Sequence, residues 1–263
     1  MRAYRIAYDG RPFHGFQRQP DVPTVADAVL DALQALDVLA GRNVPPGYAA
    51  AGRTDAGVSA SAQTIAFEAP GWLSPAALNS ELPTDIRAWA DADAAAGFHA
   101  THDATAREYV YFLHAPDTAT DRAARALDAL AGEHDFHNLT PDDTGTVRDL
   151  STGVERDGPF LVLTFRAGGF ARQLVRRTVS LVADVARGDS VERVERALAE
   201  EPLPGPEGIA PAPAHPLVLA DVAYPDLEFT VDSGGAASAR EVFGARRVEH
   251  ATLARVAGAL ADR

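Results

Sequence analysis

Apolar residues alternate with polar ones, or run together, in several stretches of the chain that turn residues separate. In residues 107–114, Tyr109, Tyr111 and Leu113 share one side, which is the period of two expected of a β-strand. Residues 158–167 are apolar on both sides, as in a strand that is buried on both faces. The predicted strands are 2–8, 61–69, one within 78–93, 107–114, 158–167 and 217–224.

Other stretches place apolar residues at the spacing of a helix. In residues 24–41 an apolar stripe follows Thr24 and Asp27, which are spaced as in a capping box, and Gly41 is expected to end the helix. The proline-rich residues 202–216 are predicted to be an irregular connector. The predicted helices are 24–41, 119–132, 168–188, 190–201 and 249–263.

This order of elements predicts an α+β fold with antiparallel sheets and helices packed on one face. An RRM-like, or ferredoxin-like, sheet in each half of the chain is compatible with the order. A change in composition near residues 97–105 suggests a boundary, so we expect an N-terminal domain of residues 1–100 and a C-terminal domain of residues 101–263.

The composition of the chain excludes several kinds of site and of protein. The 263 residues include no cysteine, which excludes disulfides, thiolate metal sites and cysteine nucleophiles. No apolar run is long enough to span a membrane, and the N-terminus reads as a strand rather than a signal peptide, so we expect a cytoplasmic protein.

Charge is the unusual feature of the composition. All 24 basic residues are arginine, against 37 acidic residues, which gives a net charge of −13. An acidic chain without lysine suits a very salty cytoplasm, and we hypothesise a halophilic source, although a GC-rich genome also depletes lysine.

The arginines are unevenly distributed along this acidic chain. Residues 158–183 contain four arginines and no carboxylate, and residues 1–20 contain four arginines and one aspartate. Two interpretations remain open: a basic cleft on an acidic body, which would suit a nucleic acid, or scattered arginines that are simply solvated.

The segment GRTDAGVSA (52–60) places Asp55 among small residues on a loop before a strand. Gly52 and Gly57 permit tight or left-handed backbone there, and Arg53 is suited to binding a phosphate or a carboxylate. The segment alone is compatible with a solvated turn acid and with a positioned catalytic acid.

Two further residues are candidates for a site with Asp55. Arg176 lies on the predicted helix 168–188; if it is buried it requires an anionic partner, for which Asp55 is a candidate, and otherwise it faces solvent or binds RNA phosphate. Tyr109 is either a packing residue or an aromatic platform for a base. His134 and His137 have no accompanying third ligand and the chain has no glycine-rich phosphate loop, so we expect no metal and no nucleotide cofactor.

Several of these stretches, taken in order, resemble the signature blocks of the TruA-type tRNA pseudouridine synthases. The Asp55 block is highly specific, and the resemblance covers nearly the whole chain. The blocks are YDGRPFHGFQRQP (8–20), GRTDAGVSA (52–60), LNSELPTDI (78–86), FHATHDATAREYVYF (98–112) and FARQLVRRTVSLV (170–182), with GEHDFHNL (132–139) and APAHPLVLADVAYP (212–225) in the same order.

The resemblance implies a role for each of the three candidates. Asp55 would be the catalytic aspartate and nucleophile, Tyr109 would pack on the target uracil, and Arg176 would pair with Asp55. The implied fold has two RRM-like halves with the active cleft between them, in a homodimer. The implied reaction converts uridine to pseudouridine at positions 38, 39 and 40 of the anticodon stem-loop of tRNA, without a cofactor. Expected RNA contacts are Tyr109, Arg53, Gln17, Arg18 and Arg172.

The chain departs from the family pattern at four positions. Ser59 stands where His is common, Thr101 where Arg is common, and Ser180 and Pro216 where Gly is usual. None of them removes the three central residues, but Ser59 and Thr101 bear on RNA contacts.

Two other functions make different demands on the sequence. A non-catalytic RNA-binding protein on the same fold would need arginines and aromatic residues but no particular acid. An aspartate-dependent glycosidase or hydrolase usually needs a second positioned carboxylate, and the signature blocks contain no partner acid.

Overall fold

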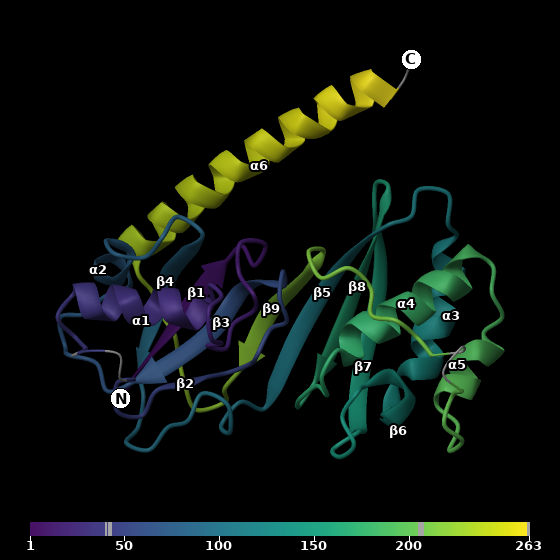
Figure 1. The fold of residues 1–263 in the computed structure, drawn as a ribbon, viewed down its shortest axis with the longest axis horizontal. Helices are drawn as coiled ribbons and strands as arrows, with labels where there is room; N and C mark the ends of the chain where they lie inside the picture. Colours follow the sequence, from purple (N-terminus) through teal and green to yellow (C-terminus); the bar gives the residue numbers. More distant parts are fainter. Residues whose placement is uncertain (40, 42–43, 205–207, 262–263) are drawn as a thin grey trace.

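The computed structural model describes residues 1–39, 41, 44–204 and 208–261. Its centre is a ten-stranded sheet in the order β10-β4-β1-β3-β9-β5-β8-β7-β6, with β2 paired to β3 (Figure 1). The strands are β1 (Arg2–Tyr8), β2 (Ala49–Ala50), β3 (Ser59–Phe67), β4 (Ile86–Asp93), β5 (Ala106–His114), β6 (Gly132–Asp135), β7 (Val147–Asp157), β8 (Phe160–Ala167), β9 (Leu217–Ala223) and β10 (Thr230–Val231).

Six α-helices and one 3-10 turn pack around this sheet in the described residues. They are α1 (Val25–Ala35), α2 (Pro75–Asn79), α3 (Thr120–Leu130), η1 (His137–Leu139), α4 (Leu174–Arg187), α5 (Glu192–Ala197) and α6 (Ser233–Ala261). The expected α+β class is therefore confirmed; the division into two RRM-like halves stays a prediction.

The described strands pair antiparallel at every junction except one. β3 and β9 run parallel, and they pair only through Ser59 with Val218 and Ala60 with Leu219. This junction joins strands from the first hundred residues to strands from the second part of the chain. It lies directly beside the loop that precedes Ser59 and contains Asp55.

Two large hydrophobic clusters lie on either side of this junction. One is built on β1, β3 and α1, with Tyr4, Phe67 and Leu33 fully buried, and the other on β8, α3 and α4, with Phe165 and Leu127 fully buried. Tyr109 of β5 packs against both clusters. The side chain of Tyr109 is therefore placed where the two cores meet.

Helix α1 has the predicted cap but ends earlier than predicted. The Thr24 hydroxyl accepts from the Asp27 backbone N–H at 3.2 Å and donates to the Asp27 carboxylate at 2.6 Å. The helix ends at Ala35, because Asp37 takes a left-handed conformation with φ of 56°. The expected end at Gly41 is wrong, and residue 40 of that predicted helix lies outside the described residues.

Three other sequence predictions are corrected by the structure. α4 begins at Leu174 rather than 168, because Gln173 is left-handed with φ of 59°. β8 alternates between buried and partly exposed residues, so it is not buried on both faces as expected. The predicted helix 249–263 begins at Ser233, and its last two residues, 262 and 263, lie outside the described part, as do residues 205–207 of the predicted connector.

The C-terminal elements return to the first strands of the chain. β10 pairs with β4, and the start of α6 packs against β4 and α2. Figure 1 shows the rest of α6 leaving the body of the molecule as a long straight rod. None of the described helices is both long and apolar enough to cross a membrane.

Candidate active site

The loop before β3 is held from two directions by β1 and the turn that follows it. Thr54 is buried; its hydroxyl shares a hydrogen bond of 2.8 Å with the Tyr8 hydroxyl, and its carbonyl accepts from the Phe16 N–H at 3.1 Å. Gly15 lies so close that a Cβ there would be 2.8 Å from the Thr54 oxygen. The backbone next to Asp55 is thus fixed by buried contacts, which is unlike a solvated turn.

The other end of the loop is fixed by Gly10 and Ser59. The Gly10 N–H donates to the Ser59 hydroxyl at 3.0 Å, and a Cβ on Gly10 would lie 2.0 Å from the Val58 carbonyl oxygen. Only a glycine permits this approach of the 9–11 turn to the loop. Ser59, which departs from the family pattern, therefore has a structural contact in this chain.

The Asp55 carboxylate is paired with the Arg176 guanidinium of α4. The Arg176 Nη1 to Asp55 Oδ2 distance is 3.0 Å, and the side chains are 16% and 31% exposed respectively. Arg176 is itself oriented, because its Nε donates to the Ala212 carbonyl at 2.7 Å and the Ala212 N–H donates back to the Arg176 carbonyl at 3.0 Å. The pair joins residues 121 positions apart in the sequence and leaves part of the carboxylate open to solvent.

Tyr109 lies beside this pair. Its hydroxyl is 3.8 Å from the point that a Cβ on Gly52 would occupy, and its ring meets the Phe170 ring edge-on with centroids 5.2 Å apart. Withdrawal of the hydroxyl from water, together with the negative charge of Asp55, raises the pKa of Tyr109 to about 12. The structure therefore brings Asp55, Arg176 and Tyr109 together.

Arg107 is a buried residue of this region that the sequence reasoning missed. It is 9% exposed and donates to the carbonyls of Ala51 at 2.9 Å, Thr101 at 2.5 Å and Gly168 at 2.5 Å. These carbonyls come from three separate segments, including the one that leads into the Asp55 loop. The available signal was its place two residues before Tyr109, on the same strand face.

A second missed residue, Gln63, holds the start of the loop. Its buried side-chain amide accepts from the Gly52 N–H at 3.2 Å and donates to the Gly52 carbonyl at 2.8 Å. Thr101, the other departure from the family pattern, donates from its hydroxyl to the Ala50 carbonyl at 2.6 Å. A polar residue inside an apolar strand was the only sequence signal for Gln63.

The other expected RNA contacts are not gathered around Asp55 by any contact in the structure. Arg53 is exposed and makes no hydrogen bond or ion pair among the described residues, and Gln17 is exposed. Arg18 pairs with Asp27 at 2.7 Å and lines a separate hollow of about 720 Å³ beside α1. Arg172 is 61% exposed and pairs with Asp142 at 3.3 Å.

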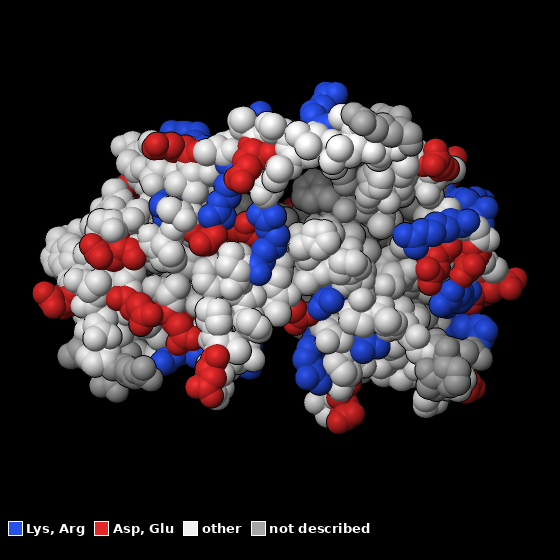
Figure 2. Space-filling view, turned by 45° about the horizontal axis from the view of Figure 1, so that its top comes forward, with Lys and Arg blue, Asp and Glu red and all other residues white. Residues whose placement is uncertain are grey.

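Most arginines of the two basic stretches form ion pairs, and every acidic partner except Asp9 comes from outside these stretches. The pairs are Arg2–Asp91, Arg5–Asp221, Arg11–Asp9, Arg18–Asp27, Arg166–Glu108 and Arg172–Asp142. Figure 2 shows basic and acidic side chains interspersed on one face. The shortage of carboxylates within a stretch of sequence is therefore not a shortage in space.

Comparison with known proteins identifies the family. The profile of the family described as tRNA pseudouridine synthase matches residues 126–225. The chain is 60% identical to "tRNA pseudouridine synthase A" of Halobacterium salinarum over 99% of this chain and 98% of the relative. It is 62% identical to the protein of that name from Natronomonas pharaonis, over the same shares, and 34% identical to that of Archaeoglobus fulgidus, over 95% and 94%.

Among solved structures, a Cbf5–Nop10–Gar1 complex aligns at 15% identity and a TM-score of 0.35, over 66% of this chain and 43% of that chain. That likeness is too low to bear on the fold. The sequence relatives are decisive, because identity of 60% extends over nearly the full length of both proteins. The chain belongs to the tRNA pseudouridine synthase family, the enzymes that convert uridine to pseudouridine in tRNA.

Proposed function

We propose that this protein isomerises uridine to pseudouridine in tRNA with Asp55 as its catalytic residue. The observation that carries the proposal is the ion pair of 3.0 Å between Asp55 and Arg176, in which the carboxylate stays 31% exposed. A carboxylate that is charged, oriented and still accessible is what attack on a substrate requires.

In the proposed reaction the Asp55 carboxylate attacks C1′ of the target ribose. The N1–C1′ bond breaks, and its electron pair leaves with the uracil. The uracil then rotates, C5 attacks C1′, and the bond to Asp55 breaks, which returns the carboxylate. Loss of the C5 proton and protonation of N1 complete an isomerisation in which no atom is gained, and no cofactor is needed.

The same carboxylate could instead remove a ribose proton from C2′, and an isotope experiment separates the two routes. We expect tRNA carrying deuterium at C2′ of the target uridine to react at the normal rate, because nucleophilic attack leaves that C–H bond intact. A primary isotope effect on single-turnover pseudouridine formation would assign the proton-abstraction route to Asp55.

Arg176 and Tyr109 act on either side of this carboxylate in the proposed site. Arg176 donates to the Asp55 carboxylate, and its own contact with Ala212 fixes the direction of the pair. With a pKa of about 12, the Tyr109 hydroxyl is neutral at pH 7, so we propose that the ring stacks on the flipped-out uracil.

We propose that the target uridines are nucleotides 38, 39 and 40 of the anticodon stem-loop, with Arg53, Gln17, Arg18 and Arg172 as RNA contacts. Of these, Arg53 is supported best, because it is exposed, unpaired and two residues from Asp55. The test uses tRNA transcripts in which the uridine at each position is replaced by cytidine, with pseudouridine mapped by mass spectrometry. Pseudouridine that persists outside these positions would contradict the assignment.

We also propose that residues 1–100 and 101–263 form two RRM-like halves with the active cleft between them, and that β10 and α6 pack back on the first half. The position of Asp55 and Arg176 on opposite sides of the β3–β9 junction supports this division. A homodimer in the cytoplasm of a halophile completes the proposal. Sedimentation in concentrated KCl tests the dimer, and a monomer at micromolar concentration would exclude it.

The alternative function, a non-catalytic RNA-binding protein on the same fold, makes a different prediction. It requires that the wild-type protein binds tRNA and forms no pseudouridine. The mapping experiment described above distinguishes the two.

A further inference from the structure

Helix α6 stands away from the body while its first turns are firmly held. Of its 29 residues, only Gly235 and Ala236 are buried. A Cβ on Gly235 would lie 2.7 Å from the Ala88 carbonyl oxygen, and the Gly235 N–H donates to the Asp232 carboxylate at 2.6 Å. The helix therefore begins in close contact with β4 and then extends into solvent (Figure 1).

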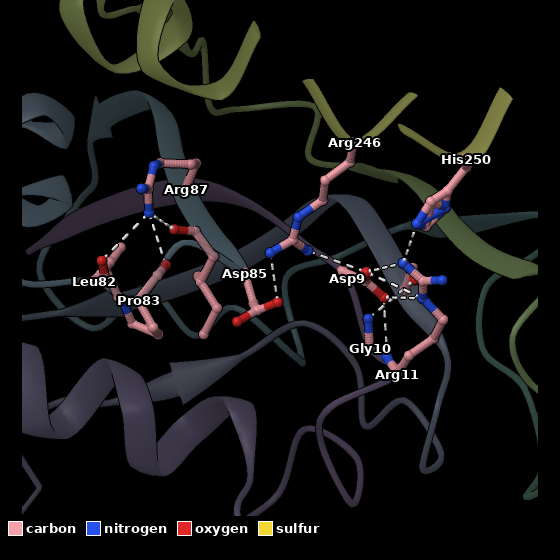
Figure 3. A network of polar contacts seen from close by, with 11 residues as sticks. Asp9, Gly10, Arg11, Leu82, Pro83, Asp85, Arg87, Arg246 and His250 are labelled. Atoms are coloured by element: carbon pink, nitrogen blue, oxygen red, sulfur yellow. Dashed lines mark hydrogen bonds and ion pairs between the residues drawn. The ribbon is translucent and has the colours of Figure 1, made fainter. Parts of the chain in front are cut away.

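A charged network fixes the direction in which α6 leaves the body. Arg246 contacts Asp85 at 2.6 Å and Asp9 at 3.1 Å, and Arg11 joins Asp9 to His250 (Figure 3). Burial alone would raise the pKa of Asp9, but hydrogen bonds from Arg11 and the charges of Arg11 and Arg246 outweigh it and lower that pKa. The Asp9 carboxylate, which links Arg11 to Arg246, therefore stays charged at neutral pH, and the network holds the helix in this direction as an arm of the molecule.

The arginines of this arm differ from those of the body. Most of the arginines that the structure describes have a polar partner, commonly a carboxylate or a backbone carbonyl; five of them have no hydrogen bond or ion pair among the described residues. Three of the five lie on α6, and another is Arg53 beside the candidate catalytic residue. The five are Arg53, Arg125, Arg240, Arg247 and Arg255.

The three free arginines of α6 share one side of the helix. They are spaced seven and eight residues apart, so they form a row about 22 Å long at a rise of 1.5 Å per residue. Between them the same side carries only small residues, such as Gly244, Ala251 and Gly258, so a partner can approach the helix closely. Of the two glutamates of α6, Glu249 lies on the opposite side of the helix and Glu241 lies at the edge of this row.

The charge of α6 opposes that of the whole protein. The described helix has four arginines and two glutamates, whereas the chain has a net charge of −13. An extended row of unpaired guanidiniums on an acidic protein matches a polymer of phosphates better than it matches a small anion.

We propose that the row formed by Arg240, Arg247 and Arg255 on α6 binds the phosphate backbone of the tRNA substrate, outside the site at Asp55. The inference deepens the proposed function, since it takes tRNA as the substrate. Because backbone contacts position an RNA without reading its bases, the arm contributes affinity and orientation but takes no part in the chemistry.

The test compares binding and chemistry in a variant that carries Arg240→Gln, Arg247→Gln and Arg255→Gln. The Kd for unmodified tRNA is measured over a series of KCl concentrations at which circular dichroism shows the proteins folded. We expect the Kd to rise roughly tenfold or more, and the slope of log Kd against log [KCl] to fall by about one for each arginine. Single-turnover tritium release from tRNA labelled at uracil C5 should be unchanged when tRNA is saturating.

Two controls isolate the charge and the location. Lysine at the same three positions should retain most of the affinity and salt dependence, because a point charge still meets phosphate. Arg125→Gln removes an exposed, unpaired arginine from α3 and should leave the Kd unchanged, unlike each single α6 substitution.

A triple glutamine variant with wild-type Kd and salt slope would overturn the proposal. So would a change confined to the sedimentation coefficient, which would assign this side of α6 to contact with another copy of the chain. Absence of tritium release by the wild-type protein would instead contradict the proposed function, so the two failures are distinguishable.

Discussion

The Asp55 carboxylate is oriented by one guanidinium and by the buried neighbours of its loop. Arg176 is 16% exposed, so the pair is screened less than a surface ion pair and more than a fully buried one. Thr54 and Gly52, on the same loop, are fixed by Tyr8 and Gln63. Buried residues beneath the loop thus determine where the Asp55 carboxylate lies.

Removal of Arg176 should lower stability and turnover together. We expect Arg176→Ala to cost about 1–2 kcal/mol of unfolding free energy, because it leaves a partly buried carboxylate unpaired. In an Asp55→Asn background the same substitution should cost less, since no charge is left behind. Chemical denaturation of the four proteins in this cycle measures the coupling, and equal costs in both backgrounds would exclude the ion pair.

Two substitutions of Tyr109 can distinguish the contribution of its ring to tRNA binding from that of its hydroxyl. Tyr109→Phe keeps the ring and should bind tRNA normally, whereas Tyr109→Ala should lose roughly 1–3 kcal/mol of binding to the base. The comparison is made by tRNA titration at pH 7. Equal affinity of the alanine variant and the wild type would contradict the stacking role.

The raised pKa of Tyr109 also predicts a pH dependence of stability. An unfolded tyrosine ionises near pH 10, but the folded one ionises near 12. The folded state therefore retains a proton that the unfolded state loses, and stability falls as pH rises from about 10 to about 12. Tyr109→Phe removes this contribution, so its Tm should fall less steeply over that range than that of the wild type.

At the scale of elements, local signals predict some boundaries well and others poorly. β1 has the predicted bounds, and β5 and β9 lie within one residue of them, because their patterns of apolar residues are strong. β7 was missed because, of its eleven residues, only Leu150 is buried, so it carries almost no apolar alternation. The start of α6 was missed because Gly234 and Gly235 disfavour a helix, yet Gly235 is required by its approach to Ala88.

For the candidate site, too, the sequence predicted some residues and missed others. The resemblance to the synthase family identified Asp55, Tyr109 and Arg176 as site residues. The structure brings these three side chains together. The sequence could not indicate that Arg107 and Gln63 hold the loop, because their partners are backbone carbonyls distant in sequence. Nor could the sequence indicate which arginines form ion pairs with acidic residues in the folded protein.

Arg107 should matter more for stability than an exposed arginine with similar partners. Arg107→Met leaves carbonyls of three segments without their donor, so we expect a loss of about 3 kcal/mol or more. Arg156 also donates to three backbone carbonyls but is exposed, and Arg156→Met should cost under about 1 kcal/mol. Urea unfolding measures both, and similar losses would show that Arg107 does not hold these segments together.

For the whole molecule, the net charge of −13 predicts a protein that is stabilised by salt. Screening reduces repulsion among the 37 acidic residues, so the Tm should rise as KCl increases from about 0.1 M to about 2 M. The same salt weakens contacts with tRNA phosphates. Calorimetry across this series checks the prediction, and a Tm that stays constant or falls would contradict a halophilic origin.

The central claim is that the Asp55 carboxylate performs the chemistry on a tRNA that the rest of the molecule binds. The most direct measurement is tritium release from tRNA labelled at uracil C5 by Asp55→Asn, a variant that removes the charge and keeps the shape. The account predicts a folded protein that binds tRNA within about threefold of the wild type and reacts at least about a thousandfold more slowly. Release at the wild-type rate would show that the reaction does not depend on this carboxylate.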